Sequence, residues 1–328
     1  MTAPVRLVIT ECDHDAFEQE EAVAAAYGAS LVRADAHTPD ELVEACAEAD
    51  GIIVQYAHIT AEVLDRLPRL RAIGRYGVGV DTVDVAAATQ RGIAVCNVPD
   101  YGTEAVSDHA VALAVALVRQ VGRADTLVRQ GRPEFANVRP VRLFSELTFG
   151  VLGCGLIGAA TARKAAALGF RVQVCDVRAE GPAWQGFEAV DRETLLATSD
   201  VVSVHTPLDS ETRHLIDAAA LAQMRPTAYL VNTSRGGVVD TDAVVAAIEA
   251  GALAGAGLDV METEPLPADS PLLGMERVIL TPHIAWYSEE TYGELKRRTV
   301  ENVAEYLSGR RPRNIVNPDV LTLEGLPR

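Results

Sequence analysis

The feature that most constrains the fold of this chain is a glycine-rich turn between two apolar runs. The first run, at 149–152, leads into Gly153, Gly155 and Gly158, and the second run ends at Asp176. Glycines at this spacing, placed between a strand and a helix and followed about 20 residues later by an acid, form the dinucleotide-binding pattern. Three glycines near a strand can also be a simple turn. The surrounding strand, helix and acid favour a dinucleotide site.

Each residue of this turn has a physical task. Gly153 permits the tight turn, Gly155 lets the pyrophosphate approach the bare backbone, and Gly158 lets the helix close on the sheet. The phosphates would then meet the positive N-terminus of the helix, at the N–H groups of residues such as Leu156 and Ile157. Asp176 is expected to bind both ribose hydroxyls and to repel a 2′-phosphate, which favours NAD over NADP; Arg178 weakens that preference slightly.

Composition restricts the domain number and the partners. A chain of 328 residues, of which 48% are hydrophobic, is expected to form two domains. Its net charge of −17 repels nucleic acid and anionic lipid, so neither is an expected partner. The five cysteines stand singly, without metal-ligand spacing, and are expected to be buried thiols. With no signal-like or membrane-spanning run, we expect a cytoplasmic protein without a bound metal.

Short apolar runs alternate with amphipathic stretches, which is typical of an α/β fold with parallel sheets. In the first hundred residues the expected strands are 5–10, 30–33, 51–55, 70–75 and 93–98, and the expected helices are 15–27, 39–49, 60–67 and 83–91. After the glycine-rich turn the expected strands are 200–205, 228–232, 254–259 and 278–281, and the expected helices are 192–198, 217–224, 241–251 and 288–307. The second region is the predicted doubly wound cofactor domain.

The loop at 75–81 is a candidate substrate site. It follows a predicted strand, at the edge where open α/β sheets bind ligands, and its glycines bring N–H groups within reach of a carboxylate. Arg75 adds a positive charge, and Val78 and Gly79 are the expected backbone contacts. The loop could equally be a strand-to-helix turn capped by Asp81, and both descriptions can hold together.

The stretch at 103–130 is long, apolar and helical in pattern. It is followed at 131–147 by an irregular polar segment with Arg132, Arg139 and Arg142. On an otherwise acidic chain this segment could be a dimer arm or a solvated loop.

Five motifs in order resemble the D-isomer-specific 2-hydroxyacid dehydrogenase family: the glycine-rich turn and four others. Besides 153–158, they are Val-His-Thr-Pro-Leu at 204–208, Leu-Val-Asn-Thr-Ser-Arg-Gly-Gly at 230–237, Leu-Asp-Val at 258–260 with Glu264-Pro265, and Thr-Pro-His-Ile-Ala at 281–285. Segments 75–81, 94–99 and 283–289 look most like the C-terminal binding protein branch. The resemblance implies a homodimer with a Rossmann-type domain, 100–287, inserted into a flavodoxin-like substrate domain, 1–99 plus 288–328. Hinges are implied near Pro99 and Trp286.

The resemblance implies a role for three residues in hydride transfer between NAD and a 2-hydroxy or 2-keto acid. His283 is the general acid/base, because an imidazole exchanges its proton near neutral pH. Glu264 is the carboxylate paired with it, which stabilises the imidazolium. Arg235 would grip the carboxylate of the acid at two points and polarise its carbonyl. Each residue alone could be an ordinary surface or core residue; their common order favours the catalytic interpretation.

The remaining residues come from family position. Val106 is expected at the nicotinamide; His205, Thr206, Pro207 and Thr212 on the adenosine and phosphate side; Thr233, Asp259 and Ala285 at the nicotinamide ribose and amide. Asp259 could also be a structural acid at a strand end. Trp286 could accept an apolar substrate side chain or pack against the hinge.

Two functions from different classes follow. The first is an NAD-dependent oxidoreductase acting on a D-2-hydroxy acid or its 2-keto partner, which we favour. The second is an NAD-responsive dimeric scaffold of the corepressor type. The triad of Arg235, Glu264 and His283 does not separate them, because the corepressors retain it. The acidic surface disfavours a DNA-linked role.

Overall fold

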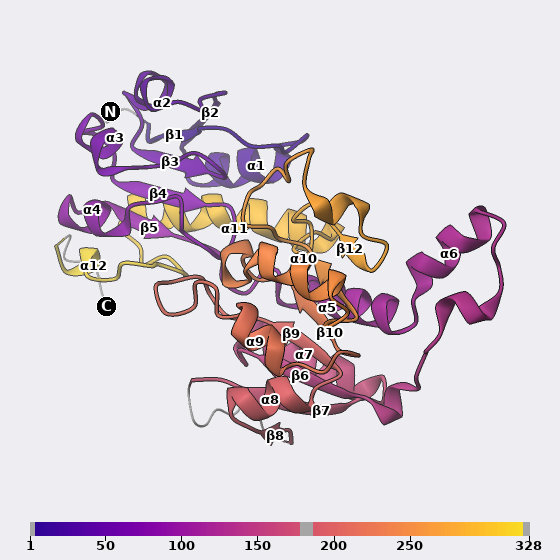
Figure 1. The fold of residues 1–328 in the computed structure, drawn as a ribbon. Helices are drawn as coiled ribbons and strands as arrows, with labels where there is room; N and C mark the ends of the chain where they lie inside the picture. The colour runs from indigo at the N-terminus through magenta and orange to yellow at the C-terminus, as the bar shows by residue number, and fades with distance from the viewer. Residues whose placement is uncertain (1–3, 178–185, 324–328) are drawn as a thin grey trace. The chain divides into compact units, whose positions relative to one another are not determined.

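The chain divides into two compact units, each built on its own parallel sheet. Unit 1 consists of Met1–Gly102 and Ser288–Arg328, and unit 2 of Thr103–Tyr287. The computed structural model describes residues 4–177 and 186–323, so Arg178 lies outside the described residues. Figure 1 labels the helices and strands of both units.

Unit 1 has the strand order of flavodoxin-like folds. Its five strands run in the order β2-β1-β3-β4-β5, and every neighbouring pair is parallel. The strands are β1 (Arg6–Ile9), β2 (Ser30–Arg33), β3 (Gly51–Val54), β4 (Ala72–Arg75) and β5 (Ala94–Cys96). The helices are α1 (Glu18–Ala26), α2 (Pro39–Cys46), α3 (Ala61–Asp65), α4 (Val85–Gln90), α11 (Glu289–Leu307) and α12 (Val320–Leu323).

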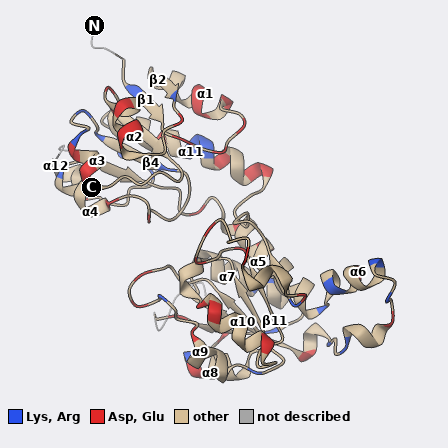
Figure 2. Cartoon of the chain, turned by 45° about the horizontal axis from the view of Figure 1, so that its top comes forward, with Lys and Arg blue, Asp and Glu red and all other residues tan. Residues whose placement is uncertain are grey.

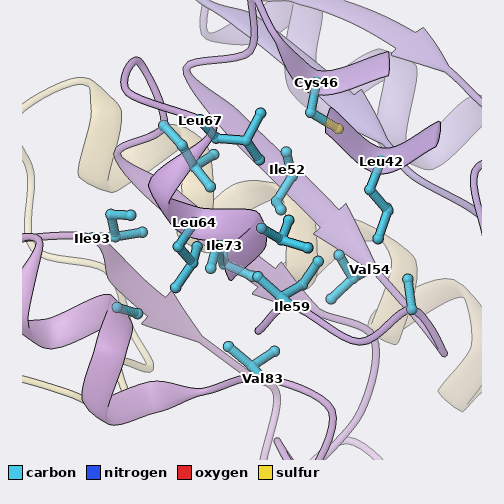
Figure 3. Packing of buried hydrophobic residues seen from close by; sticks show 14 of the residues in the cluster. Leu42, Cys46, Ile52, Val54, Ile59, Leu64, Leu67, Ile73, Val83 and Ile93 are labelled. Carbon is cyan, nitrogen blue, oxygen red and sulfur yellow. The ribbon is translucent and has the colours of Figure 1, made fainter. Parts of the chain in front are cut away.

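The two faces of this sheet are covered by different parts of the chain. On one face, side chains such as Leu42, Ile52 and Ile73 form a buried apolar cluster with α2, α3 and α4 (Figure 3). On the other face, α11 lies against β3, β4 and β5. Its close approach requires glycine in the strands, because a Cβ added at Gly51 or Gly74 would come within 2.7 Å of a Val303 methyl group.

Unit 2 has the Rossmann strand order with one added strand. Its seven strands run in the order β12-β11-β10-β9-β6-β7-β8, and all pairs are parallel. The order reverses between β6 and β9, the point at which such sheets bind dinucleotides. The strands are β6 (Thr148–Leu152), β7 (Arg171–Cys175), β8 (Glu188–Ala189), β9 (Val201–Val204), β10 (Tyr229–Asn232), β11 (Gly255–Leu258) and β12 (Val278–Leu280). The helices are α5 (Thr103–Val118), α6 (Val121–Arg129), α7 (Leu156–Ala167), α8 (Arg192–Thr198), α9 (Ala218–Gln223) and α10 (Thr241–Glu249).

The prediction of one helical stretch at 103–130 was wrong in one respect. The structure divides it into two helices, α5 and α6. Gln120 lies between them with φ 52°, a left-handed conformation that ends a right-handed helix. The polar segment that follows contains two short 3-10 turns, η1 (Phe135–Val138) and η2 (Phe144–Glu146). We call residues 119–147 the arm. Figures 1 and 2 both show α6 reaching out from the rest of unit 2.

Candidate active site

The three residues predicted to be catalytic follow three neighbouring strands of unit 2. Arg235 follows β10, Glu264 follows β11, and His283 follows β12. These strands lie side by side in the sheet, and their parallel direction brings the three loops to its carboxyl edge.

Glu264 and His283 are hydrogen-bonded to each other. Glu264 Oε2 lies 2.7 Å from His283 Nδ1, and Glu264 Oε1 accepts the Met261 N–H at 2.8 Å. Burial alone would raise the pKa of Glu264. The bonds from His283 and Met261, together with the charge of Arg235, outweigh burial and hold that pKa below its ordinary value. Glu264 is therefore an acceptor at neutral pH, and His283 Nδ1–H donates to it.

Arg235 is presented by a turn that the buried Asn232 shapes. The Asn232 Oδ1 accepts the backbone N–H and the hydroxyl of Ser234, and its Nδ2 donates to the Arg235 carbonyl at 2.9 Å. Gly236 then lies directly against the next loop, because an added Cβ would stand 1.9 Å from the Met261 carbonyl oxygen. This contact holds the turn of Arg235 against the loop that carries Glu264.

Asp259 organises the loop that carries His283. Its carboxylate is buried and accepts the Thr281 hydroxyl at 2.6 Å and the N–H groups of Ile284 and Ala285 at 3.0 and 2.9 Å. Its carbonyl accepts the His283 N–H at 2.8 Å. His283 has φ 56°, a left-handed conformation that this set of bonds stabilises. The sequence left open a ribose contact or a structural role for Asp259; the structure shows these structural bonds, and the ribose contact stays a prediction.

The glycine-rich turn after β6 leaves no room for side chains. Gly153 has φ 91°, and an added Cβ would stand 2.8 Å from the His205 backbone. At Gly158, where α7 runs along the turn, an added Cβ would stand 2.0 Å from the Gly153 carbonyl oxygen. Gly155 immediately precedes Leu156 and Ile157 at the start of α7. The Cys154 N–H donates to Asp176 Oδ2 at 2.7 Å, which fixes the acid beside the turn.

The edge of unit 2 beyond this turn carries polar atoms that suit a dinucleotide. The Oγ1 atoms of Thr206 and Thr233 are buried and lack a hydrogen-bond partner within 4–177 and 186–323. Such atoms are expected to bind a ligand or water. The Thr212 hydroxyl instead donates to the Pro207 carbonyl at 2.7 Å. The Val106 side chain, in α5, is buried. Ala285 is buried too, and Asp259 binds its N–H group.

His205 is a neutral imidazole at physiological pH. Burial lowers its pKa from 6.5 to about 4, and its Nε2 lies 2.9 Å from the Ser203 hydroxyl. A neutral ring beside the glycine-rich turn can donate a hydrogen bond at one nitrogen and accept one at the other.

A second histidine–glutamate pair was not predicted. His214 Nε2 lies 2.5 Å from Glu262 Oε1, and Glu262 Oε2 accepts the Thr241 N–H at 3.0 Å. Glu262 precedes Glu264 by two residues, so this pair ties the same loop to the segment after β9. No local pattern in the sequence links His214 to Glu262, because 48 positions separate them.

The residues predicted to bind substrate lie in both units. In unit 1, Arg75 ends β4, and its guanidinium lies across Gly77, where an added Cβ would stand 1.6 Å from Nη1. The Val78 carbonyl, in the same loop as Gly79, accepts the Asn97 amide at 2.6 Å. In unit 2, the ring of Trp286 meets Tyr287 edge to face, with centroids 5.7 Å apart. These contacts define the local geometry of each residue and leave the substrate roles as predictions.

The described part of the chain holds neither a metal centre nor a membrane span. Residues 4–177 and 186–323 contain no group of three or more His, Cys, Asp and Glu side chains that could hold a metal ion. Within the same residues, no helix combines the length and the apolar character needed to cross a membrane.

Comparisons with known proteins agree with this geometry. Residues 111–285 match the family of the D-isomer specific 2-hydroxyacid dehydrogenase, NAD binding domain. The chain is 42% identical to a glyoxylate reductase of Korarchaeum cryptofilum over 286 residues, which is 85% of this chain and 86% of that protein. A D-3-phosphoglycerate dehydrogenase of Archaeoglobus fulgidus is 38% identical over 85% of this chain, but that match spans only 53% of the relative.

Solved structures of similar proteins have the same fold. The TT0316 protein of Thermus thermophilus superposes with a TM-score of 0.87 at 36% identity, covering 95% of this chain and 100% of that chain. A D-lactate dehydrogenase of Aquifex aeolicus, complexed with NAD and lactic acid, superposes with a TM-score of 0.84 at 30% identity, covering 95% and 99%. The chain therefore belongs to the D-isomer specific 2-hydroxyacid dehydrogenase family, the NAD-dependent oxidoreductases that transfer hydride between the cofactor and a 2-hydroxy or 2-keto acid.

Proposed function

We propose that this chain reduces a small 2-keto acid to the D-2-hydroxy acid and catalyses the reverse oxidation. The observation that carries the proposal is the 2.7 Å bond between Glu264 and His283 Nδ1. With Nδ1 engaged, Nε2 is the atom left to exchange a proton with the substrate oxygen. Similar proteins named glyoxylate reductase and D-lactate dehydrogenase support a small substrate.

The roles of the three residues follow from their chemistry. NADH, when bound, supplies the hydride. His283 delivers a proton from Nε2 to the carbonyl oxygen, and takes it back in the oxidation. Glu264 orients the ring and stabilises its charged form. Arg235 binds the substrate carboxylate and draws electron density from the carbonyl. We propose, in addition, that Arg75, Val78 and Gly79 are substrate contacts and that Trp286 contacts the substrate side chain.

The proposal is tested by following NADH oxidation at 340 nm with glyoxylate, pyruvate, hydroxypyruvate and longer 2-keto acids. We expect turnover with at least one of them and oxidation of the D-isomer of the product. His283→Ala should lose at least about a thousandfold in kcat while its Kd for NADH stays the same, because general acid–base catalysis and preorganisation are both removed.

Tight NADH binding without turnover on any 2-keto acid would contradict the proposal and favour the scaffold function. The closeness to the C-terminal binding protein branch stays a prediction from the motifs, because the relatives reported above are named as enzymes.

We also propose that the chain is a homodimer joined through the arm. The arm exposes several large apolar side chains: Val121, Val128, Phe135, Val141 and Leu143. A cavity of about 260 Å³ at its base is lined in part by Leu117, Tyr229 and Pro140. A second copy of the chain would cover these side chains. We propose a cytoplasmic location as well, which the single, widely spaced cysteines of the sequence support.

A further inference from the structure

Helix α5 contacts the catalytic loop through a residue that no motif identified. His109 Nε2 lies 2.9 Å from the Thr281 hydroxyl and 3.6 Å from Asp259 Oδ1. The Thr281 side chain is separated from His109 by 172 positions in the sequence. Its neighbour His283 is the proposed acid/base, so this contact reaches the catalytic loop from a helix far away in the sequence.

The protons in this contact can be assigned. The Thr281 hydroxyl has one proton, and at 2.6 Å from the Asp259 carboxylate it donates that proton to Oδ1. Thr281 Oγ1 can therefore only accept at its 2.9 Å contact with His109. His109 must carry a proton on Nε2, whether its ring is neutral or charged.

The result is a network of four hydrogen bonds that converges on the Asp259 carboxylate. His109 donates to Thr281, Thr281 donates to Asp259, and Asp259 accepts the N–H groups of Ile284 and Ala285. The His109 side chain is 22% exposed and the Asp259 side chain 1% exposed, so these hydrogen bonds are largely shielded from water. The hydrogen bond from His109 polarises the Thr281 hydroxyl and strengthens its bond to Asp259.

His109 also shares a helix face with a predicted cofactor contact. Val106 precedes it by three residues in α5, and residues three apart lie on one side of a helix. The same helix face therefore presents an apolar side chain expected at the nicotinamide and a donor that reaches the loop of His283.

We propose that His109 is a positioning residue, which fixes the catalytic loop at 281–285 relative to α5 by donating a hydrogen bond to Thr281. The proposal rests on the proposed function, in which His283 exchanges the proton. Without the donor, the Thr281 hydroxyl can turn away from Asp259, and the loop that carries His283 loses one of its fixed points.

The experiment compares His109→Leu, which removes the donor, with His109→Gln, whose amide nitrogen can replace Nε2. Thr281→Val removes the hydroxyl, and Thr281→Ser keeps it. His37→Leu is the matched control, because His37 is an exposed histidine in unit 1 that pairs with Asp35. Each variant is assayed for kcat and KM with the best 2-keto acid, for Kd of NADH by fluorescence titration, and for amide hydrogen exchange.

We expect His109→Leu to lose about 10- to 100-fold in kcat, because small misplacements of a catalytic group have effects of this size. The Kd for NADH should rise less than kcat falls, since neither His109 nor Thr281 is itself a predicted cofactor contact. His109→Gln should recover most of the rate. The double variant with His109→Leu and Thr281→Val should lose no more in kcat than the more impaired single variant, because both substitutions break the same hydrogen-bond network.

Hydrogen exchange separates this proposal from the proposed function. If the amides of Ile284 and Ala285 exchange faster in His109→Leu but not in His109→Gln, the positioning role stands even where the wild-type protein turns over no 2-keto acid. Wild-type exchange and wild-type kcat in His109→Leu would overturn it. Equal losses in the leucine and glutamine variants, or additive losses with Thr281→Val, would also overturn it.

Discussion

Two buried residues position the candidate catalytic side chains. Gly236 acts through its lack of a side chain, and Asp259 acts through its carboxylate. The first lets the turn of Arg235 lie against the loop of Glu264, and the second holds the loop of His283. Neither group needs to touch substrate to affect the rate, because preorganised positions account for a large part of enzymatic catalysis.

Gly236→Ala should therefore impair both turnover and folding. The added methyl group meets a backbone carbonyl at 1.9 Å, which cannot move aside as a flexible side chain would, so the loops of Arg235 and Glu264 must separate. We expect a fall in kcat/KM of at least about tenfold and a loss of about 1–3 kcal/mol in the free energy of unfolding. Steady-state kinetics and urea titration measure both.

Gly274→Ala provides the control for this prediction, because nothing lies within 4 Å of a Cβ added there. If Gly236→Ala matches that control in kcat/KM, the contact between the two loops does not position Arg235 and Glu264.

His205 should make the stability of the protein depend on pH. Burial lowers its folded-state pKa to about 4 from an ordinary 6.5. Between these values the unfolded chain binds the proton and the folded chain does not, so stability falls as the pH drops through this window. From pH 7 to pH 5 the loss from this group is about 2 kcal/mol.

Urea titration of the wild type and of His205→Gln at both pH values isolates this contribution, because glutamine does not titrate. The wild type should lose about 2 kcal/mol more than the variant. Parallel losses in the two proteins would show that His205 keeps an ordinary pKa in the folded state.

At the same scale, the sequence indicated the candidate catalytic residues better than the residues that support them. Arg235, Glu264 and His283 each stand in a motif, and the structure places two of them within hydrogen-bond distance. His109 stands in an apolar helical run without a motif. Its partner Thr281 comes from a loop 172 positions away, and no local pattern encodes a contact between segments so far apart in sequence.

At the scale of elements, buried strands were easy to predict and the arm was not. Strands such as β3 and β9 are buried at every position, as parallel strands with both faces covered require. Strand β8 has two exposed residues, Glu188 and Ala189, and offers no apolar run. The break at Gln120 escaped prediction because neither glycine nor proline stands at that position.

The arm gives a prediction at this scale. Phe135 and Leu143 are 73% and 66% exposed, and the proposed dimer buries them. Phe135→Asp with Leu143→Asp should raise the dimer Kd at least about tenfold, because buried apolar anchors dominate interface energies. Sedimentation velocity over a range of concentrations measures the shift from dimer to monomer.

Leu273→Asp is the matched control, since Leu273 is 59% exposed but lies outside the arm. An arm variant that sediments as the control does would remove the arm from the interface.

At the scale of the whole molecule, the two units differ in how the chain builds them. Unit 2 is one continuous segment with its own buried clusters on both sides of its sheet, whereas unit 1 joins two segments. The sequence predicted two domains from length and alternation. The C-terminal stretch is too short to form a domain of its own, which predicts that it packs on the first domain, and the family resemblance implies the same; the pattern of an amphipathic helix such as α11 does not specify the strands that it covers.

Residues 103–287 should therefore fold when expressed alone. We expect cooperative unfolding in urea and NADH binding within about tenfold of the full chain, because the dinucleotide pattern lies entirely within this segment. Circular dichroism and fluorescence titration measure these properties. A segment that unfolds without cooperativity would show that unit 2 depends on unit 1 for its stability.

The seating of Val303 against Gly51 and Gly74 has a consequence for synthesis on the ribosome. Every strand of both sheets is translated before α11. One face of the first sheet therefore lacks its α11 cover while roughly two hundred further residues are synthesised. A chain that terminates before α11 would contain the complete nucleotide-binding unit and a first sheet with one exposed apolar face. Chaperones and proteases would recognise such a chain.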